Sequence, residues 1–274
     1  MSRVAGAVAA IALVAALGFA LAACQTQGTE TKIVTSESDA SLASWLAKPE
    51  GDGPFPAAVL MHGCSGTERN TSHQTVWRGL GAHAALLNEN GYVTLIVDSF
   101  GPRRITDGCQ TGGKYFPLQV SDAYAAYDHL ASLPFVDEDR IGLVGLSLGG
   151  GTAIRVAASG HGRASPGYSA VVAYYPYCSD FFYRFDLPLL ILIGAEDDWT
   201  PAQLCRNLAP RAPDRVELVV YPEAHHSFDL PMQGPYYVEG MSGRLHTVQG
   251  NPEARRDSQR RMLKFFETHL GPAG

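Results

Sequence analysis

A serine between glycines is the residue of this sequence best suited to chemistry. Ser147 lies in the segment G-L-S-L-G, residues 145–149. The residues before it, 141–146, form an apolar run of strand length, and residues 152–158 after it have helical character. A G-x-S-x-G turn between strand and helix holds the serine Oγ away from the backbone and places the Leu148 amide at a helix N-terminus, where developing negative charge is stabilised. The alternative interpretation is a purely structural glycine-rich turn.

A serine nucleophile needs a base to take its proton and an acid to orient that base. An acidic run, residues 196–198, follows an apolar strand expected at residues 187–193, and a histidine pair, residues 225–226, follows another at residues 216–221. In parallel sheets, ligands bind at the carboxyl ends of the strands. The chain order serine, carboxylate, histidine is the order of the α/β-hydrolase triad. The sequence therefore predicts that the three groups converge at one edge of a sheet.

Strand-like and helix-like segments alternate along most of the chain. We expect strands at residues 31–36, 41–47, 57–61, 92–97, 140–146, 169–174, 187–193 and 216–221, and helices at 75–90, 118–133, 152–158 and 253–270. The first two strands form an antiparallel pair. The alternation that follows predicts a mostly parallel sheet covered by helices on both faces.

Four motifs together resemble the dienelactone hydrolase family of α/β-hydrolases. They are H-G-x-x-G at residues 62–66, G-x-S-x-G-G at 145–150, G-x-x-D-x-x-x-P at 194–201 and A-x-H-S-F at 224–228. The resemblance covers nearly the whole chain after its first 23 residues. It implies the α/β-hydrolase fold, with a mostly parallel central sheet of about eight strands flanked by helices on both faces.

Carried over residue by residue, the resemblance assigns Ser147 as nucleophile, Asp197 as acid and His226 as base. It makes the backbone amides of Cys64 and Leu148 the oxyanion hole, and it implies neither a cofactor nor a metal. The best-known members of the family have cysteine at the position of Ser147 and glutamate where this chain has glycine at residue 63. Because of these two departures, the resemblance does not by itself imply dienelactone as the substrate.

The residues themselves leave alternatives for the acid and the base. Asp198 or Glu196 are alternative acids, because a shift of one residue on a loop redirects a side chain. His225 is an alternative base, and we interpret His62 as a ring packed beneath the oxyanion loop. The other histidines are interpreted as solvated or structural residues without partners: His73, His83, His129, His161, His246 and His269.

Five residues are candidates for contact with substrate. Phe100, Arg103 and Arg104 follow the expected fourth strand at the catalytic edge, and an arginine there suits a substrate carboxylate. The alternative for this segment is a turn with solvated arginines. Tyr175 and Trp199 are rim candidates, with packing as their alternative.

The N-terminal residues predict an export signal. Residues 1–23 combine Arg3, an apolar stretch and small residues, and L-A-A-C at 21–24 resembles the lipobox of bacterial lipoproteins. We expect a signal peptide over 1–23, lipidation of Cys24, a polar tether over 24–30 and a single domain over 31–274. The protein would then be anchored in the bacterial membrane facing the periplasm, with Gln25 favouring the outer membrane. An uncleaved transmembrane anchor is the alternative.

Charge and cysteine content narrow the possibilities further. Without residues 1–23 the chain has 20 basic and 27 acidic residues, a net charge of −7, and no basic patch for nucleic acid. Export to an oxidising compartment favours disulfides, and loops after neighbouring strands of the fold lie within bonding reach. We therefore expect Cys64 to pair with Cys109 and Cys178 with Cys205. The alternative is that two or all four are reduced.

The functional prediction is a serine hydrolase that cleaves ester or lactone bonds of small to medium substrates through an acyl-enzyme. Alternatives are a peptidase or acyltransferase on the same scaffold, or a binding lipoprotein without turnover. A metallohydrolase is disfavoured, because no metal-binding motif occurs. Residues 230–250 form either a lid or a surface excursion. The sequence does not indicate an oligomeric state.

Overall fold

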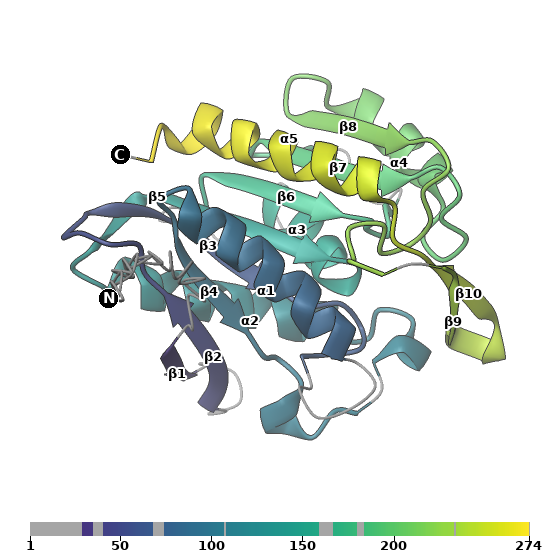
Figure 1. The fold of residues 1–274 in the computed structure, drawn as a ribbon, viewed down its shortest axis with the longest axis horizontal. Helices are drawn as coiled ribbons and strands as arrows, with labels where there is room; N and C mark the ends of the chain where they lie inside the picture. The colour runs from purple at the N-terminus through teal and green to yellow at the C-terminus, as the bar shows by residue number, and fades with distance from the viewer. Residues whose placement is uncertain are drawn as a thin grey trace, which may run out of the picture.

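The central sheet of the protein has eight strands in the parts of the chain that the structure, a computed structural model, describes. These parts are residues 29–34, 41–67, 74–106, 108–158, 167–179, 184–232 and 234–273. The strands are β1 Thr29–Val34, β2 Ser41–Ala47, β3 Phe55–Met61, β4 Val93–Val97, β5 Val136–Leu146, β6 Ala170–Tyr174, β7 Leu189–Gly194 and β8 Val216–Tyr221. They lie in the order β1-β2-β4-β3-β5-β6-β7-β8 (Figure 1).

The direction of the strands matches the sequence prediction. β1 and β2 are antiparallel to each other, β2 is antiparallel to β4, and β4, β3, β5, β6, β7 and β8 are all parallel. β4, β6 and β7 are buried along their whole length. Such continuous apolar strands belong to a sheet covered on both faces. The carboxyl ends of the parallel strands therefore share one edge.

Helices cover both faces of this sheet. They are α1 Gln74–Glu89, α2 Phe116–Ala131, α3 Leu148–Ala157, α4 Ala202–Leu208 and α5 Pro252–Leu270. In Figure 1, α1 and α5 lie in front of the sheet and α2 and α3 lie behind it. α2 begins two residues before the predicted start because Pro117 is tolerated in the first turn of a helix.

α3 begins directly after Ser147, four residues earlier than the sequence predicts. Glycines 149–151 have poor intrinsic helix propensity, but here the packing decides. A Cβ on Gly149 would lie 2.4 Å from the carbonyl oxygen of Met61 on the neighbouring strand. Only glycine allows the first turn of α3 to approach β3 this closely.

A two-stranded hairpin stands apart from the sheet, at the edge where the parallel strands end (Figure 1). β9 Tyr236–Glu239 pairs in antiparallel fashion with β10 Leu245–Val248, and the short 3-10 turn η4 Met241–Gly243 joins them. The sequence predicts only an extra segment over residues 230–250, without its structure. Strands of four residues, separated by glycines 240 and 243, are too short for the alternation of side chains to identify them.

The N-terminal boundary differs slightly from the prediction. Residues 29 and 30, expected in the tether, pair with Leu46 and Trp45 in the sheet. The predicted signal peptide, Cys24 and the rest of the tether lie outside the described residues. In the described part of the chain, every helix is too short or too polar to cross a membrane.

Candidate active site

Ser147 occupies the sharp turn between β5 and α3. Its φ angle is 54° and its ψ angle is −109°, a conformation that non-glycine residues rarely adopt. A Cβ on Gly145 would lie 2.0 Å from the carbonyl oxygen of Gly149, so glycine is obligatory where the turn closes. The strained backbone directs the hydroxyl of Ser147 away from the sheet, into the space where the carboxyl ends of the strands meet.

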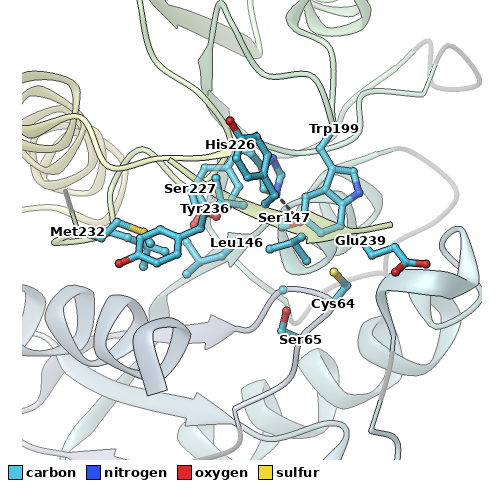
Figure 2. Close-up of a pocket in the computed structure, with 16 residues that line it drawn as sticks. Cys64, Ser65, Leu146, Ser147, Trp199, His226, Ser227, Met232, Tyr236 and Glu239 are labelled. Atoms are coloured by element: carbon cyan, nitrogen blue, oxygen red, sulfur yellow. Dashed lines mark hydrogen bonds between the residues drawn. The ribbon is translucent and has the colours of Figure 1, made fainter. Parts of the chain in front are cut away.

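His226 contacts Ser147 and Asp197 with its two ring nitrogens. Its Nε2 lies 3.0 Å from Ser147 Oγ, and its Nδ1 lies 2.8 Å from Asp197 Oδ2. The three residues come from three strand ends, after β5, β7 and β8, and Figure 2 shows the histidine beside the serine. Asp197 is 4% exposed and His226 is 2% exposed. Water is therefore largely excluded from the hydrogen bonds that join them.

The loop around Asp197 holds its carboxylate in the ionised form. Oδ1 accepts hydrogen bonds from the amides of Trp199 and Thr200 at 3.0 and 2.7 Å, and Oδ2 accepts from Thr200 Oγ1 at 2.8 Å. Burial alone would raise the pKa of Asp197. The His226 ring and the Thr200 donors outweigh that effect and hold the pKa below its ordinary value of 3.8. An ionised Asp197 accepts the Nδ1–H of His226, which leaves Nε2 free to accept the serine proton.

The alternative acids and base lie elsewhere. The carboxylate of Asp198 accepts hydrogen bonds from the amide and hydroxyl of Thr247, both at 3.0 Å, and so holds β10. Glu196 is exposed. The Nδ1 of His225 contacts the backbone carbonyl of Glu196 at 3.0 Å. The structure therefore brings Asp197 and His226, and none of these three, to Ser147.

His62 packs beneath the loop at residues 63–66, the loop predicted to carry one oxyanion donor. Its Nε2 accepts the Ser99 amide at 3.1 Å, so its Nδ1 carries the proton and donates to the Gly63 carbonyl at 2.6 Å. Burial lowers the pKa of His62, so the ring stays neutral near neutral pH. The ring of Phe100 packs edge-on against it at 4.6 Å. A neutral ring held by two hydrogen bonds gives this loop a fixed position.

The loop beyond His62 brings the Cys64 backbone beside the N-terminus of α3. Cys64 and Leu148 both line a cavity that contains Ser147. Leu148 is the first residue of α3, where backbone amides have no partner within the helix. A Cβ on Gly63 would lie 3.2 Å from the Cβ of Ser147, so a glutamate there would crowd the Ser147 side chain. This close approach explains why glycine occupies position 63 here, where the best-known family members have glutamate.

Two of the five predicted substrate contacts lie at the site and three do not. Tyr175 and Trp199 line a cavity with Ser147, and their rings lie 4.7 and 5.0 Å from the ring of His226. Phe100, Arg103 and Arg104 line neither cavity beside Ser147. Their prediction as pocket residues is wrong, because the strand end turns away from the cavities into the 3-10 helix η1 Gly101–Arg103.

Arg103 instead forms a buried ion pair. Its two terminal nitrogens each lie 2.8 Å from one carboxylate oxygen of Asp122 on α2, and Nη1 also donates to the Ser99 carbonyl. The Asp122 side chain is fully buried and that of Arg103 is 13% exposed. Burial raises the pKa of Asp122 above 3.8, although the charge and hydrogen bonds of Arg103 oppose this shift. Arg103 thus joins the loop after β4 to α2, and it lines neither cavity beside Ser147.

We expect Arg103→Met to lower the free energy of unfolding by about 3 kcal/mol at pH 7.5, because it leaves the Asp122 carboxylate buried without its partner. Without the guanidinium the pKa of Asp122 rises further. The loss of unfolding free energy should therefore be smaller at a pH below this raised pKa, because Asp122 is then neutral. Thermal and urea unfolding at pH 7.5 and 5.0 measure both effects. Arg104→Met, at an exposed neighbour, is the matched control and should change little. Equal losses at the two pH values would contradict the ion-pair interpretation.

Two histidines that the sequence analysis interprets as partnerless have partners. His83 Nε2 on α1 lies 2.7 Å from Asp229 Oδ2, and both side chains are buried. His246 on β10 stacks on Trp199 with ring centroids 4.9 Å apart, and its Nδ1 donates to the Asp198 carbonyl at 3.0 Å. Each contact joins elements far apart in the sequence. No local pattern indicates such contacts, so sequence reasoning missed them.

Both predicted disulfides are present. Cys64 bonds to Cys109 and Cys178 bonds to Cys205, with Cα atoms 4.8 and 5.0 Å apart. The first joins the oxyanion loop to the 3-10 helix η2 Cys109–Thr111. The second joins the end of β6 to α4. Among the described residues, no group of three His, Cys, Asp or Glu side chains is placed to hold a metal ion.

We expect the double variant Cys64→Ser, Cys109→Ser to lose about 2–4 kcal/mol of stability. It should also lose about tenfold in kcat, because the Cys64 amide then has a less fixed position and preorganised oxyanion donors contribute strongly to rate. Cys178→Ser, Cys205→Ser is the matched control and should lose stability with a smaller change in kcat. Unfolding curves and ester hydrolysis measure the two quantities separately. Equal kcat values for the two variants would show that the first disulfide does not serve the oxyanion loop.

The sheet order, the serine at the turn after β5 and the acid and histidine after β7 and β8 define the α/β-hydrolase class. The profile of the dienelactone hydrolase family matches residues 42–270 of the chain. The protein therefore belongs to the dienelactone hydrolase family, as its motifs predict, and it is a hydrolase.

Similar proteins agree with this placement. A probable 2-oxo-3-(5-oxofuran-2-ylidene)propanoate lactonase of Bradyrhizobium sp. is 25% identical over 213 residues, which are 72% of this chain and 82% of the relative. A putative dienelactone hydrolase from Klebsiella pneumoniae has a TM-score of 0.66 at 19% identity, covering 87% of this chain and 97% of its own. A dienelactone hydrolase-like promiscuous phosphotriesterase from metagenomic libraries has a TM-score of 0.68 at 19% identity, covering 89% and 99%. The two structures are similar to this chain in fold.

Proposed function

We propose that the protein is a serine hydrolase that cleaves carboxylic ester or lactone bonds of small to medium substrates through an acyl-enzyme. One observation carries the proposal. Asp197, His226 and Ser147 form a continuous line of hydrogen bonds of 2.8 and 3.0 Å that ends at the base of two cavities. The orientation matches what general-base activation of a hydroxyl requires.

The chemistry follows from this geometry. Ser147 Oγ attacks the carbonyl carbon while His226 Nε2 takes its proton, and Asp197 stabilises the imidazolium that forms. The amides of Cys64 and Leu148 stabilise the oxyanion. The carbon–oxygen bond to the alcohol then breaks as His226 returns the proton to the leaving oxygen. A water molecule, deprotonated by the same ring, then attacks the acyl-Ser147 carbonyl. The bond between the acyl carbon and Ser147 Oγ breaks as His226 returns the proton to Oγ, and the acid is released.

A fluorophosphonate tests the proposal directly, because it forms a covalent bond only with an activated serine. We expect the purified protein to gain one phosphonyl group, located on Ser147 by peptide mass mapping, and to hydrolyse short-chain p-nitrophenyl esters. As the reagent is titrated, turnover should fall in proportion to the fraction of protein that carries the label. A folded protein with neither labelling nor turnover would contradict the proposal and favour a binding protein that keeps the fold.

We also propose that the protein is a lipoprotein, cleaved before Cys24 and held by its lipid at a bacterial membrane facing the periplasm. The two disulfides support an oxidising compartment. Metabolic labelling with an alkyne fatty acid should mark the protein and should be lost in Cys24→Ala. Labelling that persists in that variant would contradict the assignment.

A further inference from the structure

Two cavities meet at Ser147, with volumes of about 430 and 420 Å³. We call them the first and the second cavity. Both contain Cys64, Ser147 and Trp199 in their walls. The β9–β10 hairpin closes over both, because β9 lines the first cavity and Met241, Arg244 and His246 line the second. Figure 2 shows the residues around the first cavity, with Trp199 and the Ser147–His226 pair side by side.

The hairpin is bound to the catalytic loops and so has a defined position over the cavities. Thr247 of β10 donates twice to Asp198, the neighbour of the catalytic acid. Val248 forms a bridge with His226, and the Gln249 amide donates to the His226 carbonyl at 3.2 Å. His246 stacks almost parallel on Trp199, with 7° between the ring planes. Side chains of the hairpin can therefore determine which substrates fit.

The direction of proton transfer assigns one half of an ester to each cavity. His226 must protonate the leaving oxygen, so the alcohol half has to lie on the side where His226 is accessible. His226 lines the first cavity and does not line the second, whereas Trp199, whose ring lies 5.0 Å from that of His226, lines both. The first cavity therefore takes the alcohol half, and the second takes the acyl half beside the Leu148 amide.

The two cavities differ in charge. The first is lined by tyrosines and apolar side chains, and Glu239 is its one carboxylate. The second has Arg244, the one arginine or lysine among the residues that line either cavity, and no carboxylate in its wall. Within the described parts of the chain, Arg244 forms no ion pair. Its guanidinium is thus available to an anion at the far end of an acyl group.

We infer that the enzyme prefers half-esters of short dicarboxylic acids with apolar or aromatic alcohols, and that Arg244 binds the free carboxylate of the acyl half. This inference rests on the proposed serine hydrolase function and goes beyond it in naming the substrate class. Hydrolysis would yield a dicarboxylate and an uncharged alcohol. The same charge distribution disfavours esters whose carboxylate lies on the alcohol half, since that half faces Glu239 and no cation.

Three benzyl esters of matched size test the assignment. They are benzyl butyrate, monobenzyl succinate and 4-carboxybenzyl butyrate, which carry no carboxylate, a carboxylate on the acyl half and a carboxylate on the alcohol half. We expect the highest kcat/KM for monobenzyl succinate and the lowest for 4-carboxybenzyl butyrate, measured by chromatography of the released alcohol. Arg244→Gln should lower kcat/KM for monobenzyl succinate by about tenfold, the effect of one solvent-accessible charge-assisted hydrogen bond, and leave benzyl butyrate within about twofold.

Arg104→Gln is the matched control, because it removes one exposed arginine that lines neither cavity. It should leave the ratio of succinate to butyrate hydrolysis unchanged. An equal loss on both esters in Arg244→Gln, or an Arg244 effect confined to 4-carboxybenzyl butyrate, would overturn the inference while the serine hydrolase function stands. Absence of both hydrolysis and fluorophosphonate labelling in the folded protein would instead refute the proposed function, and the inference with it.

Discussion

Ser147→Ala should lower kcat for ester hydrolysis by about five to six orders of magnitude, the loss typical of removing the nucleophile of a serine hydrolase triad. The remaining rate would come from binding and from the oxyanion amides, which the substitution leaves in place. Hydrolysis of p-nitrophenyl butyrate, with protein concentrations high enough to detect the residual rate, measures the effect. Fluorophosphonate labelling should vanish in the same variant. The folded state should be retained, because only one partly exposed hydroxyl is lost.

Ser65→Ala is the matched control for this experiment. Ser65 also lines the first cavity, but its Oγ contacts the Cys109 sulfur at 3.5 Å and not His226. We expect its kcat to stay within about threefold of the wild type, as for a surface substitution away from the reacting atoms. If Ser65→Ala lost activity and labelling while Ser147→Ala retained them, the nucleophile assignment would be wrong.

Asp197→Asn should lower kcat by about 10⁴-fold at pH 7.5, the loss typical of replacing the triad carboxylate by its amide. The asparagine side chain can donate to His226 Nδ1, which favours the ring tautomer with its proton on Nε2. That nitrogen then cannot accept the proton of Ser147. KM should change little, because Asp197 is buried behind the ring and does not line either cavity. Steady-state kinetics on p-nitrophenyl butyrate separates the two parameters.

Asp198→Asn tests the assignment of the acid against its nearest alternative. Its carboxylate accepts hydrogen bonds from Thr247 and lies on the hairpin side of the loop, so we expect a loss below about tenfold, from weaker fixation of the hairpin. The effect should appear mainly in KM, since the hairpin lines both cavities. A larger loss of kcat in Asp198→Asn than in Asp197→Asn would reverse the assignment.

Local patterns were sufficient for most of the fold. β3, β4 and β7 are continuous apolar runs bounded by turn residues. All side chains of such a run are buried only in a sheet covered on both faces. The sequence also predicts the turn at Ser147, since only glycine fits where β5 and α3 approach. It does not predict the hairpin. Its strands have four residues each, and β10 is held in place by contacts with the loops that carry Asp198 and His226, far away in the sequence.

Some features of the site were likewise predictable from the sequence, and others required the structure. The order of Ser147, Asp197 and His226 along the chain and their places after successive strands were visible in the sequence, because parallel strands bring their carboxyl ends together. The choice between Asp197 and Asp198 required three-dimensional geometry. The two carboxylates are adjacent on one loop, and only the contacts with His226 and Thr247 distinguish them.

The sequence by itself thus determined the class of the fold, the nucleophile turn and the edge of the sheet where the site lies, because each depends on residues close together in the chain. Tertiary structure decided which arginine lines a cavity beside Ser147. Arg103 follows a strand at the correct edge, yet Asp122 on α2 binds it, whereas Arg244 follows no strand of the central sheet and lines a cavity because the hairpin folds over the site. The physical reason is that the packing around a long charged side chain determines whether it contacts a partner or solvent. That packing involves segments distant in the sequence.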